Sequence, residues 1–218
     1  MARQKVSENS QNGKRREEIV NAAARLFKMH GYQGAAVRQI ADEAGLTSGS
    51  IFYYFKSKED LLEDVIAQAM QSGLQIVQDQ ISDATGSLSR FHALVLAHLT
   101  AITGPLGAAH EVSFQEWKSL AADARQRLQA LNKLYRQVWM QILNDLKRNG
   151  YLFSDPEHCR RNLIAALNWP PALKSIPAAS KLPNVANQFC SVALNIDEAK
   201  FRDLCVAEGR STKQDSAA

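Results

Sequence analysis

Apolar residues recur at helical spacing along most of the chain, and no stretch shows the strict alternation of a β-strand. The first apolar set predicts a helix over about 14–30, and Gly31 directly after it fits a left-handed cap. A short second helix is expected over about 37–44, where Gly45 ends it. Thr47 is placed to cap a third helix. This order of helix, tight turn and helix indicates a helix-turn-helix.

A long fourth helix is expected to begin after Ser57, because two acidic residues follow in a first turn where the helix dipole favours negative charge. Turn residues then separate further segments with helical spacing. These segments cover about 88–103, 111–121, 123–149, 155–169 and 183–207. The pattern predicts an all-α protein of about nine helices, with an N-terminal three-helix domain and a larger helical body.

The composition changes this picture little but narrows the class of protein. With 45% hydrophobic and 22% charged residues, the 218-residue chain fits a globular protein. Its three cysteines form no CxxC pair, so neither a disulfide framework nor a zinc site is expected. No apolar run approaches the roughly 18 residues of a membrane span, and the polar start has no apolar leader segment. We therefore expect a cytoplasmic protein.

The charge is unevenly divided along the chain. Residues 1–58 hold ten Lys and Arg against five Asp and Glu, whereas the remainder holds sixteen against seventeen. A basic N-terminal quarter on a nearly neutral body indicates that this end meets a polyanion. The alternative is a solvated, basic tail.

The stretch REEIVNAAARLFKMHGYQGAAVRQIADEAGLTSGSIFYYFKSKEDLL, over 16–62, closely resembles the DNA-binding domain of the TetR/AcrR family. The resemblance implies a cytoplasmic transcriptional repressor that binds a palindromic double-stranded DNA operator as a homodimer and is released by a small molecule. It also implies four parts: a flexible arm over 1–13, a DNA-binding domain over 14–60, a ligand-binding and dimerisation domain over 61–208, and a flexible tail over 209–218.

A recognition helix enters the major groove, so its exposed face needs small polar residues near its start and longer side chains further on. Phosphate-binding residues are expected beside it, where they position the protein without reading sequence. The predicted DNA-binding residues are Lys14, Arg15, Thr47, Ser48, Gly49, Ser50, Tyr53, Tyr54, Lys56 and Lys58. Tyr54 stands where family members more often have a histidine.

Alternatives exist for several residues of this segment. Phe52 and Phe55 are expected in the core, and Tyr53 could merely cover the edge of the domain. Lys56 and Lys58 could be a solvated charge pair, because charge runs usually face water. Ala36 stands where the family often has a capping threonine, so it is left out of the predicted site.

The body carries aromatic residues that could line a ligand cavity, although a filled core is the more common outcome. The candidates are Phe91, Phe114, Trp117, Tyr135, Trp139 and Trp169. The pieces FQEWKSL and AALNWPP are loosely similar to TetR regulators that respond to acyl-CoA thioesters or fatty acids. Such a ligand would need basic residues for its phosphates, for which Lys118, Arg125 and Lys174 are candidates.

Dimer contacts are expected from the helices over about 155–169 and 183–207, as the resemblance implies. His92, His98 and His110 lack the spacing of helical metal ligands, so no metal or other cofactor is expected, and a packing or solvent role is the default. A helical-bundle enzyme is the rival interpretation, but no HExxH motif, glycine-rich phosphate loop or ExxH pair is present. A nonspecific DNA-binding protein and an activator are further alternatives.

Overall fold

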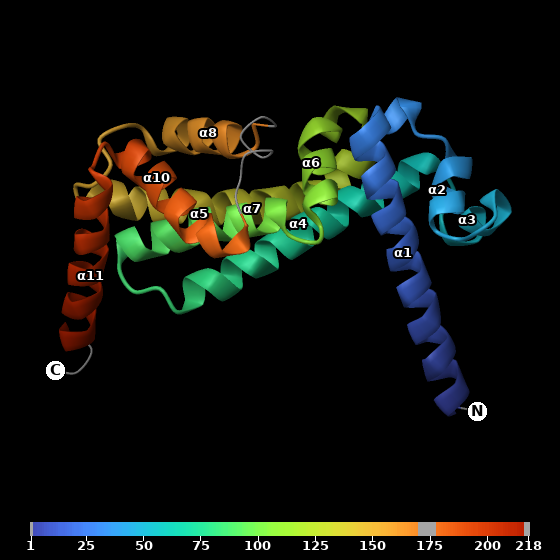
Figure 1. Cartoon of the computed structure of the whole chain (residues 1–218), viewed down its shortest axis with the longest axis horizontal. Coiled ribbons are helices and arrows are strands. Elements are labelled where there is room, and N and C mark those ends of the chain that lie inside the picture. Colours follow the sequence, from blue (N-terminus) through green and yellow to red (C-terminus); the bar gives the residue numbers. More distant parts are fainter. Residues whose placement is uncertain (1, 170–177, 216–218) are drawn as a thin grey trace. The chain divides into compact units, whose positions relative to one another are not determined.

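The computed structural model describes the backbone of residues 2–169 and 178–215, and the side chains of 11–169 and 178–209. Within these ranges the chain forms ten α-helices and two short 3-10 helices, with no strand (Figure 1). The all-α prediction is confirmed, with one helix more than the nine or so expected.

The helices follow one another with short connections, and their bounds define the labels used below. They are α1 (Ala2–Gly34), α2 (Val37–Glu43), α3 (Ser48–Tyr54), α4 (Lys58–Ser82), α5 (Ser87–Thr103), α6 (Gly107–Gln115), η1 (Trp117–Ser119), α7 (Ala122–Arg148), α8 (Pro156–Leu167), η2 (Ala179–Lys181), α10 (Leu182–Leu194) and α11 (Glu198–Asp215).

The contacts divide the chain into two compact units. The first unit consists of the chain up to Met70 together with Leu106–Gln129, and the second of Gln71–Pro105 together with the chain from Ala130 onward. The helix-turn-helix of α2 and α3 therefore shares a unit with α1, the start of α4, α6 and the start of α7. In that unit α1 packs against both α2 and α6, and α2 packs against α3.

The first unit has a core of aliphatic and aromatic side chains from α1 to α4. Its fully buried residues include Ile19, Phe27, Ile40, Ile51, Leu61, Leu62 and Ile66. The second unit has a separate core, which includes Leu88, Phe91, Leu94, Trp139, Ile142, Leu143, Cys190 and Phe201. Each unit thus has apolar packing of its own, which is the main contribution to stability in a globular unit.

Three predicted helix boundaries are wrong. α1 begins at Ala2 rather than near Lys14, so the 1–13 segment expected as an arm is helical from residue 2. The segment predicted as a helix over 111–121 is α6 followed by η1, with a non-helical Glu116 between them. The 183–207 segment is two helices, because Asn195 adopts a left-handed backbone with φ 53° that ends α10.

The start of α11 is fixed by Asp197, whose Oδ1 accepts hydrogen bonds from the backbone N–H groups of Ala199 and Lys200 at 2.9 and 3.2 Å. Such a side-chain cap satisfies N–H groups that have no partner within the helix. α11 continues to Asp215, so much of the segment expected as a tail from residue 209 is helical. The residues 170–177 and 216–218, including the Pro170, Pro171 and Lys174 of the sequence predictions, lie outside the described residues.

The N-terminus of α5 is capped by a carboxylate from α11. Glu208 Oε1 accepts from the Ser87 N–H at 2.8 Å and the Ser87 hydroxyl at 2.7 Å, and its Oε2 accepts from the Leu88 N–H at 2.8 Å. Gly86 has φ 87°, and a Cβ there would lie 2.5 Å from this carboxylate. The glycine is needed both for its backbone conformation and for the close approach of Glu208.

No single helix in the described ranges is long and apolar enough to cross a membrane, although α5 and α6 taken together would reach that length and composition.

Candidate nucleic-acid interface and effector-binding body

The candidate recognition helix α3 packs against the core of the first unit through one face and is capped at its start. Thr47 has an extended backbone and its Oγ1 accepts from the Ser50 N–H at 3.3 Å, which confirms the predicted cap. Ile51 and Phe55 are 2% and 3% exposed and fix the helix to the core of the first unit. The remaining residues of α3 are free to face outward.

The predicted DNA-binding residues lie on this outward side. Thr47, Gly49, Tyr53 and Lys56 are exposed, and the Tyr53 side chain is 76% exposed. Partial exposure is found for Ser48, Ser50, Tyr54 and Lys58, whereas Lys14 and Arg15 are exposed on α1. The fold therefore leaves every member of the predicted set at least partly accessible.

Phe52 was expected in the core but is 53% exposed. The reason is helical geometry: Ile51 and Phe55 are four residues apart and share the inner face, so the residue after Ile51 is turned about 100° away from it. Phe52 thus presents an apolar ring on the same open side as Tyr53.

Some of the side chains predicted to bind DNA already make polar contacts within the protein. The Thr47 and Ser50 hydroxyl oxygens lie 2.9 Å apart and hydrogen-bond to each other. The Lys58 ammonium donates to the Gln33 carbonyl at 3.3 Å and lies 4.6 Å from the centre of the Tyr32 ring. Lys56 has no ion pair among the residues whose side chains are described, so its charge is the more available of the two lysines.

Arg16 was not among the predicted site residues, yet it supports the end of α3. Its guanidinium donates to the Tyr54 carbonyl at 3.1 Å, forms an ion pair with Asp64 and lies 4.3 Å from the centre of the Phe55 ring. Burial raises the pKa of Asp64, and the neighbouring Arg16 opposes this rise. Arg16 therefore joins α1, α3 and α4. Its place at the start of the resembling segment was the only sequence signal for it.

The six aromatic residues proposed to line a cavity do not form one cluster. Phe91 and Trp139 are fully buried and Tyr135 is partly buried in the second unit. Phe114, which is 52% exposed, and Trp117 belong to the first unit, as do Lys118 and Arg125. Trp169 also belongs to the second unit but is 61% exposed. Helical spacing alone did not reveal this division.

A polar group inside the second unit links α5, α7 and the end of α8. The His98 Nδ1 and the Tyr135 hydroxyl oxygen are 2.7 Å apart, and the His98 Nε2 lies 3.2 Å from the Asn168 Nδ2. Asn168 also donates to the Ile164 carbonyl at 2.8 Å, and the His98 ring meets the Trp139 ring edge-to-face. His98 and Asn168 were not in the predicted ligand set, because neighbours so far apart in sequence leave no local pattern.

Two family models match parts of the chain. Residues 19–65 match the family model "Bacterial regulatory proteins, tetR family", and residues 84–172 match "Tetracyclin repressor-like, C-terminal domain". The HTH-type transcriptional repressor KstR2 of Mycolicibacterium smegmatis is 33% identical over 143 residues, which are 65% of this chain and 69% of that protein. The chain belongs to the TetR family.

Two further proteins resemble much of the chain. The fatty acid metabolism regulator protein of Bacillus subtilis is 25% identical over 133 residues, 61% of this chain and 68% of its own. The crystal structure of the superantigen PfiT is 31% identical with a TM-score of 0.66, and the match covers 82% of this chain and 95% of that one. The family models and the KstR2 relative confirm the TetR resemblance inferred from the sequence.

In this TetR-family chain, α6 and the residue that follows it contact α1 on both sides of Gly31, where α1 bends. The Tyr32 N–H donates to the Glu116 Oε1 at 2.9 Å, and Lys28 pairs with Glu111 at 2.7 Å. Arg127 of α7 forms a two-pronged contact with the Glu63 carboxylate of α4, at 2.6 and 2.7 Å. Within the first unit these contacts join α1 to α6 and to Glu116, and α4 to α7.

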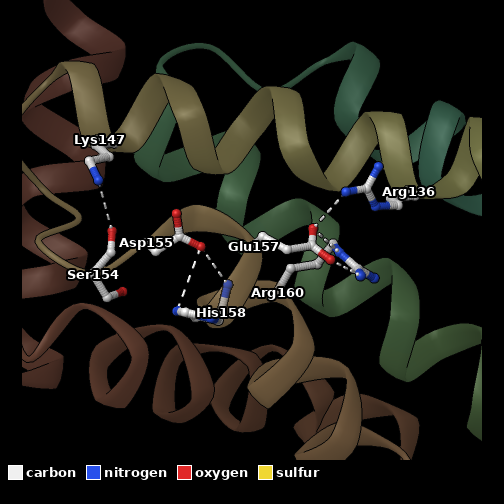
Figure 2. Close-up of polar contacts among 7 residues, drawn as sticks. All are labelled: Arg136, Lys147, Ser154, Asp155, Glu157, His158 and Arg160. Atoms are coloured by element: carbon white, nitrogen blue, oxygen red, sulfur yellow. Dashed lines mark hydrogen bonds and ion pairs between the residues drawn. The ribbon is translucent and has the colours of Figure 1, made fainter.

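The start of α8 is a second polar cluster, shown in Figure 2. Asp155 caps the helix by accepting from the His158 N–H at 2.9 Å, at the start of the segment predicted over about 155–169. Glu157 pairs with Arg160 at 2.6 Å and with Arg136 of α7 at 3.1 Å, and these contacts lower the pKa of Glu157 to about 2. The cluster fixes α8 against α7 at the surface of the second unit.

Proposed function

We propose that this protein is a ligand-responsive transcriptional repressor that binds a palindromic operator as a homodimer and leaves it when a small hydrophobic effector binds. Residues 14–60 would form the DNA-binding domain, and 61–208 the effector-binding and dimerisation domain. The observation that carries the proposal is α3, a capped helix that is buried on the Ile51 and Phe55 face and open on its polar face. We further propose a cytoplasmic location and no catalytic activity.

In the proposed complex, the open face of α3 enters the major groove. Thr47, Ser48, Ser50 and Tyr53 reach base edges with their hydroxyl groups, whereas Gly49 allows the backbone to come close to the duplex. Tyr54, Lys56 and Lys58 contact phosphates beside the helix, as do Lys14 and Arg15 of α1. The Lys58 ammonium already donates one hydrogen bond to the Gln33 carbonyl, which restricts where it can meet a phosphate.

A homodimer is proposed because a two-fold operator requires two recognition helices at a fixed spacing. The proposed contact surface lies on the segments 155–169 and 183–207, which the family resemblance implies will pair and which correspond to α8, α10 and the first part of α11. An apolar residue on the open side of α10 supports this surface: Val192 is 81% exposed. Burying such a residue against a second copy of the chain would remove apolar surface from water.

The proposed effector is a small hydrophobic molecule, with acyl-CoA thioesters or fatty acids as the preferred class. Support comes from the B. subtilis relative, whose name assigns it to fatty acid metabolism. The buried aromatic residues Phe91, Tyr135 and Trp139 provide apolar surroundings in the second unit. Trp169, in the same unit, stays a proposed contact of the effector.

Release would follow from a difference in affinity between two conformations of the protein. An effector weakens operator binding only if it binds the conformation that does not fit DNA more tightly. We propose that the shift passes through α4, which contributes residues to both units, and through the contact of Glu116 with Tyr32. A coupling free energy of about 1–3 kcal/mol weakens operator binding roughly 5–150-fold.

A mobility-shift assay on the DNA directly upstream of the protein's own gene tests this function. With excess nonspecific competitor at moderate salt, we expect a retained band for the wild-type protein. Phe55→Ala, which removes a buried anchor of α3, serves as an inactive control. A band that competitor DNA removes in proportion to its amount would contradict sequence-specific regulation and favour a nonspecific DNA-binding protein.

A further inference from the structure

The Arg16 guanidinium makes three different contacts around the end of α3. Its Nη1 donates to the Tyr54 carbonyl at 3.1 Å, and its Nη2 forms an ion pair with Asp64 of α4. The central carbon of the guanidinium lies 4.3 Å from the centre of the Phe55 ring. A planar guanidinium can donate in two directions while its face covers a ring, whereas a lysine ammonium is a point charge on a flexible stem. The three contacts therefore depend on arginine.

The Tyr54 carbonyl belongs to the last turn of α3, where backbone carbonyls have no partner within the helix. Phe55 follows with an extended backbone, so the chain leaves the helix at this point. A cation here also matches the negative pole of the helix dipole. The same turn contains Tyr53, whose ring meets the Tyr54 ring edge-to-face at 5.1 Å. Arg16 thus fixes the turn of α3 that holds a proposed base contact.

Asp64 connects this contact to α4. The next carboxylate along the helix, Glu63, makes the two-pronged contact with Arg127 of α7 at 2.6 and 2.7 Å. Two adjacent residues of α4 therefore pair with two different helices of the first unit, one with α1 and the other with α7. A movement of this part of α4 relative to α1 would change the Arg16–Asp64 contact, and with it the support of α3.

We propose that Arg16, held by Asp64, is a positioning residue for base recognition, which keeps α3 in one orientation on the operator. The inference rests on the proposed function of α3 and adds a residue that sets its specificity without touching DNA. Hydrogen bonds to base edges need well-aligned donors and acceptors, whereas a flexible lysine can follow a phosphate over a wider range. Loss of the support should therefore reduce discrimination between duplexes more than binding to DNA as such.

The rival role for Arg16 is a direct contact with a phosphate. Its side chain is 43% exposed and follows Lys14 and Arg15, two predicted phosphate contacts. Such a contact would help every duplex equally and would add to the salt dependence of binding. The ion pair with Asp64 favours the positioning role, because it already neutralises the charge that a phosphate would meet.

Asp64→Asn separates the two roles, because they predict opposite results. The positioning role predicts a roughly three- to tenfold fall in the ratio of operator to random-duplex affinity, although the variant gains one net positive charge. A phosphate contact of Arg16 predicts tighter binding to both duplexes, since the substitution frees the guanidinium. Fluorescence anisotropy of the full-length protein at several salt concentrations measures both affinities. The operator is the duplex retained in the mobility-shift assay or, where none is retained, the duplex that the protein enriches from a random pool.

Two further variants complete the test. Arg16→Lys keeps the charge but loses the planar fork, so it should lower the affinity ratio by a similar factor and leave the salt dependence unchanged. Arg25→Lys is the matched control, because Arg25 is another arginine of α1 that pairs with a carboxylate, that of Glu43 in α2. Its affinity ratio should equal that of the wild type. Circular dichroism at the assay temperature checks that each variant is folded.

The outcomes separate this inference from the proposed function. A wild-type affinity ratio in both Asp64→Asn and Arg16→Lys would overturn the inference alone. So would an equal loss on both duplexes, which is what a merely structural role of Arg16 predicts. Failure of the wild-type protein to prefer any duplex would instead overturn the proposed function, and this inference with it.

Discussion

The DNA-binding helices and the helical body use polar side chains in opposite ways. On α3 the polar groups are short, exposed and close in sequence, and they hydrogen-bond to one another when no partner is present, as Thr47 and Ser50 do. In the body, His98 and Asn168 are buried and lie 70 residues apart in sequence. The first arrangement suits a long, charged partner that meets a surface, and the second suits a small ligand that is removed from water.

This difference gives the two regions different sensitivities. A surface site tolerates substitution without loss of fold, so changes there alter binding alone. A buried polar group is part of the packing, and its loss leaves unpaired donors or acceptors in an apolar interior. The predictions below separate these two kinds of effect, from the largest to the smallest.

The sharpest contrast on the DNA-binding side is between two phenylalanines of the same turn. Phe55→Ala removes a ring that is 3% exposed and should destabilise the first unit by about 3–5 kcal/mol. Phe52→Ala, at a ring that is 53% exposed, should cost less than about 0.5 kcal/mol. Urea unfolding measured by circular dichroism compares the two variants. A similar loss for both would contradict the described orientation of α3.

His110 should make the stability of the protein depend on pH between about 6.5 and 4. Burial lowers the pKa of His110 from 6.5 to about 4, so the folded protein keeps the ring neutral while the unfolded chain protonates it below pH 6.5. Its contribution is present above pH 6.5 and lost as pH falls toward 4, by on the order of 3 kcal/mol. Denaturant unfolding of His110→Leu should show a flatter profile over this range, with His30→Leu as the matched control.

Specific and nonspecific contributions to DNA binding should separate at Tyr53 and Lys56. Tyr53→Ala should reduce the preference for operator over random duplex by roughly 1–3 kcal/mol, because it removes a side chain placed to reach base edges. Lys56→Ala should weaken binding to both duplexes alike and lower the salt dependence. Fluorescence anisotropy at several salt concentrations measures both. Equal losses on both duplexes for Tyr53→Ala would assign that ring to the edge of the domain.

The contact between α11 and α5 predicts a smaller effect in the second unit. Glu208→Ala removes the carboxylate that caps the first turn of α5 and should cost about 1–2 kcal/mol in unfolding free energy. Glu198→Ala on the same helix removes an exposed pair with Arg202 at 3.9 Å and should change stability little. Thermal unfolding of the two variants gives the comparison, and equal melting temperatures would contradict the capping role.

The smallest effect is expected at the start of α8. Arg160 and Arg136 hold the pKa of Glu157 down to about 2, below its usual 4.5, so the folded protein favours the charged form. The resulting stabilisation is present above about pH 4.5 and lost as pH falls toward 2. Glu157→Gln should therefore be slightly destabilised at pH 7 and equal to wild type near pH 2. A difference that persists at pH 2 would point to packing rather than charge.

The same contrast explains what the sequence could predict. Thr47, Gly45 and Gly31 act through neighbouring residues, so local patterns placed α3 and its cap correctly. Phe52 was misplaced because a run of aromatic residues hides which face of a short helix is buried. Arg16 and Glu116 bring distant segments together, and no pattern within one helix indicates such a contact.

In the body, helical spacing identified apolar faces but not their partners. Phe114 and Phe91 look alike in sequence, yet one is 52% exposed in the first unit and the other fully buried in the second. The break between α10 and α11 depends on Asn195, whose left-handed backbone is uncommon enough outside glycine to be missed. His98 was assigned a packing or solvent role because its partners come from α7 and the end of α8.

The central claim is that binding of an effector in the body weakens binding of DNA by α3. Fluorescence anisotropy should measure the affinity for a labelled operator with and without saturating octanoyl-CoA, at fixed salt. The account predicts a roughly 5–150-fold loss of affinity with wild-type protein. An operator affinity that saturating octanoyl-CoA leaves unchanged, while calorimetry shows the ligand bound, would contradict the account.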